Sequence, residues 1–428
     1  MAEKKQRKTW LKLDNAAKIF PASQRPGWSN VFRLSVSFRE KIDPDALRRA
    51  VAHIAPRFPS VCVHLGRGLF WYYLEEGIVP PEVKEEGCQP LLPMNKKEMY
   101  RSALRILYYE NRFAVEFFHA LTDGTGALTF VKTLAAAYLE ETRSVSVYGK
   151  EGILDPVDLP DQEELEDAFL RYEGPFAAKR TTPPAFHLTG EKERDGYLHV
   201  TCAAVPTGEL LSLAREKGVS ITALLSAVFC KCIAEIQKER VSPALEKAVR
   251  VQIPANLRKL FPSRTLRNFV AVTEVGLEKG ETDASFSEIL HIIHHQMALQ
   301  LSPRNMQAIF TANVKSEKGL AIRLVPLFLK NVVMRAVFDK VGENKACLCL
   351  SNLGKVTIPA PLSEEVIRMG FTIGPQAKAP YNCGVLSYGD TTYIHLVRNT
   401  VEPELERKFF PALSRLGLSL ILESNERN

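Results

Sequence analysis

The stretch from Phe113 to Glu141 changes its hydrophobic period at Asp123 and Gly124. Before that point, alternate residues from Phe113 to His119 share one face, which is the two-residue period of a β-strand. After it, apolar residues recur at helical spacing, at Leu128, Val131, Leu134, Ala135 and Tyr138. A strand that passes through a tight turn into a helix predicts a chain of mixed α and β structure.

Segments of both periods continue on either side of this stretch. Asp43 is a plausible N-cap, and Ser285 with Glu288 forms the capping-box pattern of a second helix. Pro403 suits the first position of the last helix, which Pro411 is expected to kink or split. Helices are predicted at 44–52, 125–141, 209–217, 221–237, 285–301, 321–338 and 403–416. Strands are predicted at 31–38, 70–74, 104–109, 113–118, 198–205, 249–253, 269–275, 346–350, 368–371, 384–388 and 392–396.

The composition changes between Tyr148 and Gly196. This stretch holds five prolines and the acidic run at 161–167, a combination typical of a linker or crossover with room for one short helix. We therefore expect an N-terminal lobe at 1–150, a linker at 151–195 and a C-terminal lobe at 196–428.

Composition and charge exclude several classes of protein. With 46% hydrophobic and 25% charged residues, the chain is neither disordered nor fibrous. Its net charge of +7 over 428 residues is too weak to indicate a nucleic-acid partner. The eight cysteines form no C-x-x-C pair, so reduced thiols and a cytoplasmic location are expected. The longest apolar stretch, 218–230, is too short to span a bilayer, and the basic start is expected to be a solvated tail.

The strongest candidate for chemistry is His119, at the end of the predicted strand. Aromatic neighbours on the same face would partly desolvate its imidazole, which suits a general base near neutral pH. Asp123 could fix the following turn or take an ion pair, and Gly124 could supply a backbone conformation that other residues resist. Two structural interpretations stay open: Asp123 could simply cap the helix, and the histidine could be a hydrogen-bonded structural residue.

His119, Asp123 and Gly124 form an H-x-x-x-D-G motif, and here the sequence resembles a known family. The motif between strand and helix is similar to that of the acyltransferase superfamily with the chloramphenicol acetyltransferase fold, most of all its bacterial alcohol O-acetyltransferase-like branch. Three further segments resemble that branch: 13–21, 251–269 and 351–354. The resemblance implies two lobes, each a mixed sheet flanked by helices, with the active-site channel between them.

The condensation domains of peptide synthetases belong to the same superfamily, but one position differs. They usually carry two consecutive histidines, of which the second is functional. Here Phe118 stands at the first position and His119 at the second. The base is retained, while the change argues against a peptide-forming condensation domain.

The resemblance implies that His119 is the general base that moves an acyl group from acyl-CoA, as co-substrate, to the hydroxyl of an alcohol. It implies an ion pair between Asp123 and Arg258, support from Asn268, and no bound cofactor. Ser351 and Asn352 are candidate oxyanion donors, although a turn explains them equally well. A loop with four basic residues could meet the CoA phosphates or be a solvated charged loop, namely Arg258, Lys259, Arg264 and Arg267.

Two alternatives to this function stay open. An acyl carrier protein could deliver the acyl group, with an ester or an amide as product, or the protein could bind ligands without turnover. No metal site is expected: His291 and His295 have the i, i+4 spacing of metal ligands, but with His294 they fit a solvated helix face better. No phosphate-binding glycine motif and no serine-hydrolase elbow is present in the sequence.

Overall fold

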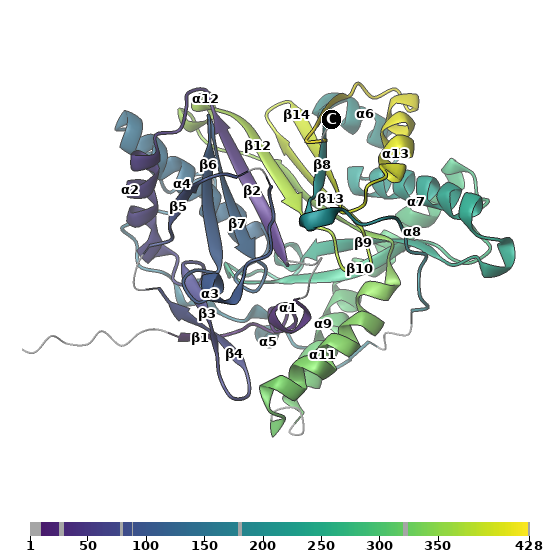
Figure 1. Cartoon of the computed structure of the whole chain (residues 1–428), viewed down its shortest axis with the longest axis horizontal. Helices are drawn as coiled ribbons and strands as arrows, with labels where there is room; N and C mark the ends of the chain where they lie inside the picture. Colours follow the sequence, from purple (N-terminus) through teal and green to yellow (C-terminus); the bar gives the residue numbers. More distant parts are fainter. Residues whose placement is uncertain are drawn as a thin grey trace, which may run out of the picture.

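Two large β-sheets lie side by side and form the two lobes of the molecule (Figure 1). The computed structural model describes residues 10–24, 30–77, 80–87, 89–178, 182–319 and 324–426. The basic start of the chain and the first three residues of the helix expected at 321–338 lie outside these ranges. Helices flank both sheets, so the predicted mixed α/β class with two lobes is confirmed.

The first sheet has five strands in the order β12-β2-β7-β6-β5. β6 and β7, both predicted as strands, form a hairpin, and β2 pairs antiparallel with β7, so that Val31 lies opposite Phe118. β12 comes from the last quarter of the chain and pairs with β2, so residues distant in sequence complete the sheet that leads to His119. The strands are β2 (Val31–Phe38), β5 (Val83–Glu85), β6 (Leu104–Tyr109), β7 (Arg112–Phe118) and β12 (Val366–Ile373).

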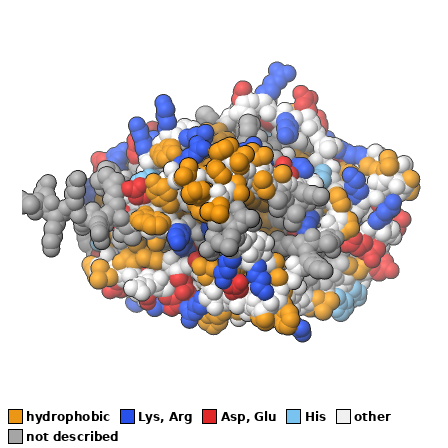
Figure 2. Space-filling model, turned by 90° about the horizontal axis from the view of Figure 1, so that it is seen from below, with side chains coloured by type: hydrophobic (Ala, Val, Ile, Leu, Met, Phe, Trp, Pro, Cys, Tyr) orange, Lys and Arg blue, Asp and Glu red, His pale blue; other side chains and the backbone are white. Residues whose placement is uncertain are grey.

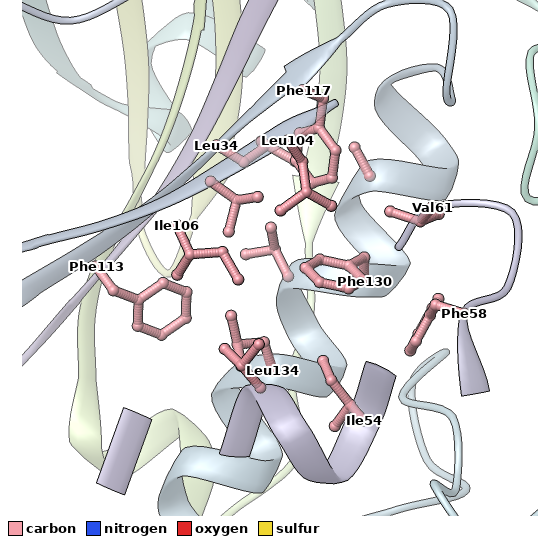
Figure 3. Packing of buried hydrophobic residues seen from close by; sticks show 14 of the residues in the cluster. Leu34, Ile54, Phe58, Val61, Leu104, Ile106, Phe113, Phe117, Phe130 and Leu134 are labelled. Carbon is pink, nitrogen blue, oxygen red and sulfur yellow. The ribbon is translucent and has the colours of Figure 1, made fainter. Parts of the chain in front are cut away.

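Helices α2 (Pro44–Ile54) and α4 (Gly124–Arg143) pack on this sheet and on each other. Asp43 caps α2, as predicted. Figure 3 shows side chains of the sheet facing those of the helices, among them Leu34, Ile106, Phe113, Phe130, Leu134 and Ile54. Full burial contributes about 1.5–3 kcal/mol for each large apolar side chain. This core therefore holds α4, and with it Asp123 at its start, firmly against the sheet.

The second sheet has seven strands in the order β10-β9-β11-β13-β14-β8-β15. Its pairs are antiparallel except those of β11, which runs parallel to β9 and β13. α7 packs across β9, β10 and β11, and α8 and α13 pack on α7. The strands are β8 (His199–Pro206), β9 (Val249–Asn256), β10 (Val270–Leu277), β11 (Leu348–Val356), β13 (Tyr381–Tyr388), β14 (Thr391–Arg398) and β15 (Ile421–Ser424). The helices are α6 (Thr207–Glu216), α7 (Ile221–Arg240), α8 (Phe286–Gln300) and α13 (Glu404–Arg415).

A small three-stranded sheet and several helices lie below the two lobes in Figure 1. α1 packs against α11, and α5 packs against α9 over a third core formed by Phe169, Phe269 and Phe310. The strands are β1 (Trp10–Lys12), β3 (Val63–Arg67) and β4 (Tyr72–Glu76). The helices are α1 (Ile19–Ser23), α3 (Lys96–Met99), α5 (Ala168–Arg171), α9 (Pro303–Lys318) and α11 (Leu327–Val341). α12 (Leu362–Glu365) lies instead at the top of the first lobe, next to β12 and α4 (Figure 1). Short 3₁₀ turns lie at Ala55–Arg57, Gln162–Leu165, Arg194–Gly196, Pro243–Leu245, Leu257–Lys259 and Glu343–Lys345.

The differences from the predicted elements have physical causes. α9 is absent from the prediction because only Met306, Phe310 and Val314, spaced by four, mark its buried face among polar residues. Pro411 was expected to kink or split the last helix; the split is wrong, because α13 runs through Pro411 as one helix, and the kink stays a prediction. Pro403 precedes this helix as its N-cap instead of opening it. The domain boundaries at 150 and 195 stay a prediction.

Within the described residues, no single helix combines the length and the apolar character that crossing a bilayer requires. α6 and α7 together match such a span in length and composition, but they are bent by 81°.

Candidate active site

His119 lies directly after the last residue of β7, between two aromatic rings. Its backbone N–H donates to the Asn30 carbonyl at 2.9 Å, which continues the pairing of β7 with β2 by one residue. The Phe20 ring stacks on the imidazole with centroids 4.3 Å apart, and the Phe32 ring meets it edge-on at 5.0 Å. The imidazole therefore has aromatic neighbours, but these rings come from α1 and β2 and not, as expected, from its own strand. Part of the residue remains accessible to solvent.

The Asn268 amide determines which ring nitrogen of His119 carries the proton. Asn268 Nδ2 lies 3.1 Å from the His119 carbonyl oxygen and 3.3 Å from Asp14 Oδ2, and both oxygens accept. Asn268 Oδ1 therefore faces His119 Nδ1, at 3.2 Å. Because an amide oxygen can only accept, Nδ1 must donate. The lone pair of the neutral ring is then on Nε2. Within the described part of the chain, Nε2 has no hydrogen-bond partner.

The Asp14 carboxylate holds the Asn268 amide in place. The carboxylate accepts from the backbone N–H of Ala17 at 2.7 Å and from both the backbone and side-chain nitrogens of Asn268 at 3.3 Å. Complete burial raises the pKa of the Asp14 carboxyl, and the nearby Arg267 guanidinium, 3.8 Å away, opposes that shift. A residue 254 positions from Asn268 thus sets the orientation of the amide that faces His119.

Desolvation dominates the acidity of His119. Burial among the aromatic rings lowers the pKa of the imidazole, because the charged form loses its water. Hydrogen bonding to its own carbonyl, the Asp123 charge and the Asn268 amide oppose the shift without reversing it. The ring is therefore neutral at neutral pH, with an available lone pair on Nε2.

Asp123 is almost completely buried, with 1% of its surface exposed, and uses both carboxylate oxygens inside the protein. Oδ1 accepts from the N–H groups of Thr125 and Gly126, at 3.0 and 3.1 Å, and so caps α4. Oδ2 accepts from the Phe269 N–H at 2.8 Å and from Arg258 Nη1 at 2.7 Å. The helix-cap interpretation and the ion pair therefore both hold, and all four hydrogen bonds of the carboxylate are made to groups of the protein itself.

Arg258 joins the two lobes at this point. Its guanidinium also donates to the carbonyl oxygens of Thr265 and Arg267, and Asn256 beside it donates to Thr125 Oγ1 at 3.0 Å. These bonds fasten the turn between β9 and β10 to the first residues of α4. Since an arginine fork satisfies several acceptors in one plane, the residue type suits the position.

The interpretation as a solvated loop is wrong for two of the four basic residues, because Arg258 and Arg267 are largely buried, while a contact with CoA phosphates stays a prediction. Arg258 is committed to Asp123 and two carbonyls, and Arg267, 4% exposed, donates to the carbonyls of Leu165 and Lys12. Only Lys259 and Arg264 are exposed, and Arg264 pairs with Asp161 at 2.9 Å.

The prediction that Gly124 supplies a backbone conformation that other residues resist is also wrong. Gly124 is the first residue of α4 and does not have a positive φ. A Cβ there would lie 2.5 Å from Cδ2 of Leu353, so what the position needs is space. Gly126 is more constrained, because a Cβ would lie 2.1 Å from the carbonyl oxygen of Leu266 and 2.3 Å from Oγ1 of Thr122.

We expect Gly126→Ala to lower the free energy of unfolding by about 1–3 kcal/mol, since it forces backbone against backbone. Gly124→Ala should cost less, because the Leu353 side chain can rotate away and alanine favours a helix. Urea unfolding of the two variants checks this order. A larger loss for Gly124→Ala would contradict the packing described here.

Ser351 and Asn352 lie within β11, on the seven-stranded sheet. The register of β11 with β13 shifts between Asn352 and Lys355, and such a bulge re-aims side chains. Leu353 thereby reaches the start of α4. The Asn352 amide is occupied, since it donates to Thr222 Oγ1 at 3.1 Å and accepts from the Gly354 N–H at 2.8 Å. No hydrogen bond joins Ser351 or Asn352 to His119 among the described residues.

The residues that sequence reasoning missed come mostly from the start of the chain. Asp14 and Phe20 entered only through the resemblance of 13–21, and no local pattern marks them. Asn30, with a left-handed φ of 53°, donates to the Phe20 carbonyl at 2.9 Å and so ties α1 to the end of β7. Among the described residues, His291 and His295 belong to no group of three side chains that could hold a metal ion.

Comparison with known proteins places the fold. No family model matches the chain, and no curated protein matches it. F. graminearum TRI101, solved with coenzyme A and deoxynivalenol, superposes with a TM-score of 0.67 at 11% identity over 96% of this chain and 99% of that one. Polyketide synthase associated protein 5 from Mycobacterium tuberculosis gives 0.62 at 16% identity over 94% and 96%.

A third similar structure is the first condensation domain of the calcium-dependent antibiotic synthetase. It gives a TM-score of 0.62 at 13% identity over 95% of this chain and 96% of that one. At such identities the likeness concerns the fold alone. The chain therefore has the two-lobed fold of these acetyltransferase and condensation-domain structures over nearly its whole length.

Proposed function

We propose that the protein is an acyltransferase that moves an acyl group from acyl-CoA to the hydroxyl of an alcohol, with His119 as general base. The observation that carries the proposal is the state of the imidazole: Nδ1 donates to Asn268, and Nε2 is left with an accessible lone pair. A neutral base of lowered pKa is ready to accept a proton at neutral pH.

The reaction needs no nucleophile from the protein, since a thioester is already activated. Nε2 of His119 takes the proton of the alcohol as the alcohol oxygen attacks the thioester carbonyl. The tetrahedral intermediate then collapses, the carbon–sulfur bond breaks, and the imidazolium returns the proton to the leaving thiolate. The products are an ester and free CoA, and His119 is neutral again.

The other site residues act by position. Asp123 and Arg258 hold the start of α4 against the turn between β9 and β10, and Gly124 leaves room for Leu353. Asn268 and Asp14 keep the proton on Nδ1. Ser351 is the candidate donor to the oxyanion, because the Asn352 amide is already engaged.

The likeness to TRI101 supports the choice of donor, since that protein was crystallised with coenzyme A and a toxin acceptor. The likeness to condensation domains favours a second candidate, in which a carrier protein presents the acyl group. The chemistry at His119 is the same in both cases, and the two differ only in what holds the thioester.

The experiment that tests the proposal uses mass spectrometry. Purified protein is incubated with acetyl-, hexanoyl- or palmitoyl-CoA and a panel of alcohols, and in parallel with an acyl-loaded carrier protein. Ester and free CoA from the first arm support the proposal. Product only with the loaded carrier supports the second candidate, and substrate binding without product in either arm would contradict both.

The dependence of kcat/KM on pH should report His119. Because burial lowers its pKa from 6.5, the rate should stay flat above that pH. It should fall only as the pH drops below 6.5 and the ring becomes protonated. A profile measured in buffers of constant ionic strength checks this, and a rate that rises on acidification would contradict a neutral base.

A further inference from the structure

Four large apolar side chains of helix α11 are exposed to solvent, although Leu327 at its start is buried. Phe328, Leu329, Val332 and Val333 expose 59%, 48%, 68% and 59% of their surface. On the opposite face, Lys330 is 3% exposed, and its ammonium lies 3.3 Å from the centre of the Trp71 ring. A surface helix normally has the reverse arrangement, so a water-exposed outer face is unfavourable for α11.

The tip of the β3–β4 hairpin extends this apolar surface. The Leu327 N–H donates to the Leu69 carbonyl at 2.9 Å, and Lys330 Nζ donates to the Phe70 carbonyl at 2.9 Å. Leu69 is 72% exposed and Phe70 38%. We call the whole surface the α11 patch, formed by Leu69, Phe70, Leu324, Phe328, Leu329, Val332 and Val333.

Positive charge surrounds the α11 patch. Figure 2 shows hydrophobic side chains gathered on this face, with Lys and Arg side chains around them. Arg335 on α11 and Arg67 on the hairpin are both exposed. An apolar helix face with basic neighbours fits the interface of an anionic bilayer. A second copy of the chain would bring the same positive charge against itself.

The α11 patch is connected to the candidate active site through α1. α11 packs against α1, and Arg335 reaches the carbonyl of Ala22 at its end. Phe20 in the same helix stacks on His119. Contact of α11 with a lipid surface would therefore bring the side of the molecule next to His119 toward the membrane.

We propose that the α11 patch docks the protein on the surface of an anionic phospholipid bilayer, with α11 lying in the interface. The inference goes beyond the proposed function and does not depend on acyl transfer. Phe328 and Val332 insert among the acyl chains, and the exposed Arg67 and Arg335 meet the lipid phosphates.

Flotation of the full chain with vesicles tests this proposal. The vesicles are an equal mixture of phosphatidylcholine and phosphatidylglycerol, or phosphatidylcholine alone. The protein should float with the anionic vesicles, and binding should weaken in high salt. Combining Phe328→Glu with Val332→Glu should reduce binding about 10-fold or more, since two apolar side chains are lost from the contact.

The matched control carries the same change of charge at exposed leucines elsewhere, Leu159→Glu with Leu245→Glu, and should bind as the wild type does. Leu159 and Leu245 are 89% and 69% exposed. Thermal unfolding of both variants confirms that they fold. The proposal is overturned if the wild type stays in the aqueous fraction, if both double variants bind equally, or if sedimentation shows a dimer that only the α11 variant dissociates.

Discussion

Replacing His119 with alanine is expected to lower kcat for acyl transfer by about 10²–10⁴-fold, which is the usual contribution of a positioned general base. The substitution removes the imidazole, whose Nε2 lone pair is available because Nδ1 donates to Asn268. Steady-state rates with the best acyl-CoA and alcohol measure the effect. KM should change little, because Asp123 and Arg258 still hold the surrounding turn.

His291→Ala is the control for this variant, since that histidine is exposed on α8 and should be dispensable. Imidazole added to the His119→Ala protein should restore part of the rate, because a small base can occupy the space beside Phe20 and Phe32. A His119→Ala protein as active as the wild type would show that another group removes the proton.

The second large effect is on stability. Asp123→Asn should lower the free energy of unfolding by about 3–5 kcal/mol, because it leaves the Arg258 guanidinium half-buried without its counter-charge. The side-chain oxygen that caps α4 can remain, so the loss reports the ion pair more than the cap. Urea unfolding followed by circular dichroism gives the value.

Asp161→Asn is the matched control. Its ion pair with Arg264 lies at the surface, with side chains 43% and 63% exposed, and such pairs contribute about 0–1 kcal/mol. Equal losses for the two variants would contradict the structural role assigned to Asp123.

Local sequence patterns predicted those helices and strands whose apolar residues recur with a clear period within one segment. β2, the β6–β7 hairpin and α4 follow from alternation and from helical spacing within one segment each. α9 does not, because its buried face is marked by few apolar residues. The pairing of β12 with β2 brings together residues more than three hundred positions apart, which no local pattern reports.

The residues of the candidate active site also differ in how far the sequence alone could predict them. His119, Asp123 and Gly124 lie within six residues, so one segment shows them together. The partners that give them their state come from elsewhere: Asn268 orients the ring, and Asp14 orients Asn268. The role of Arg258 was predicted from a resemblance to a known family. The constraint on Gly126 could not be predicted, because it depends on the position of the Leu266 carbonyl in the folded chain.

The acyl transfer proposed here needs a neutral His119, with its proton on Nδ1 and a free lone pair on Nε2. Nitrogen NMR of protein labelled in its histidine rings tests this directly, with the His119 signals assigned by their loss in His119→Ala. We expect a protonated Nδ1 and an unprotonated Nε2 at neutral pH, and both nitrogens protonated only in acid. A ring protonated on Nε2, or charged at neutral pH, would contradict this expectation.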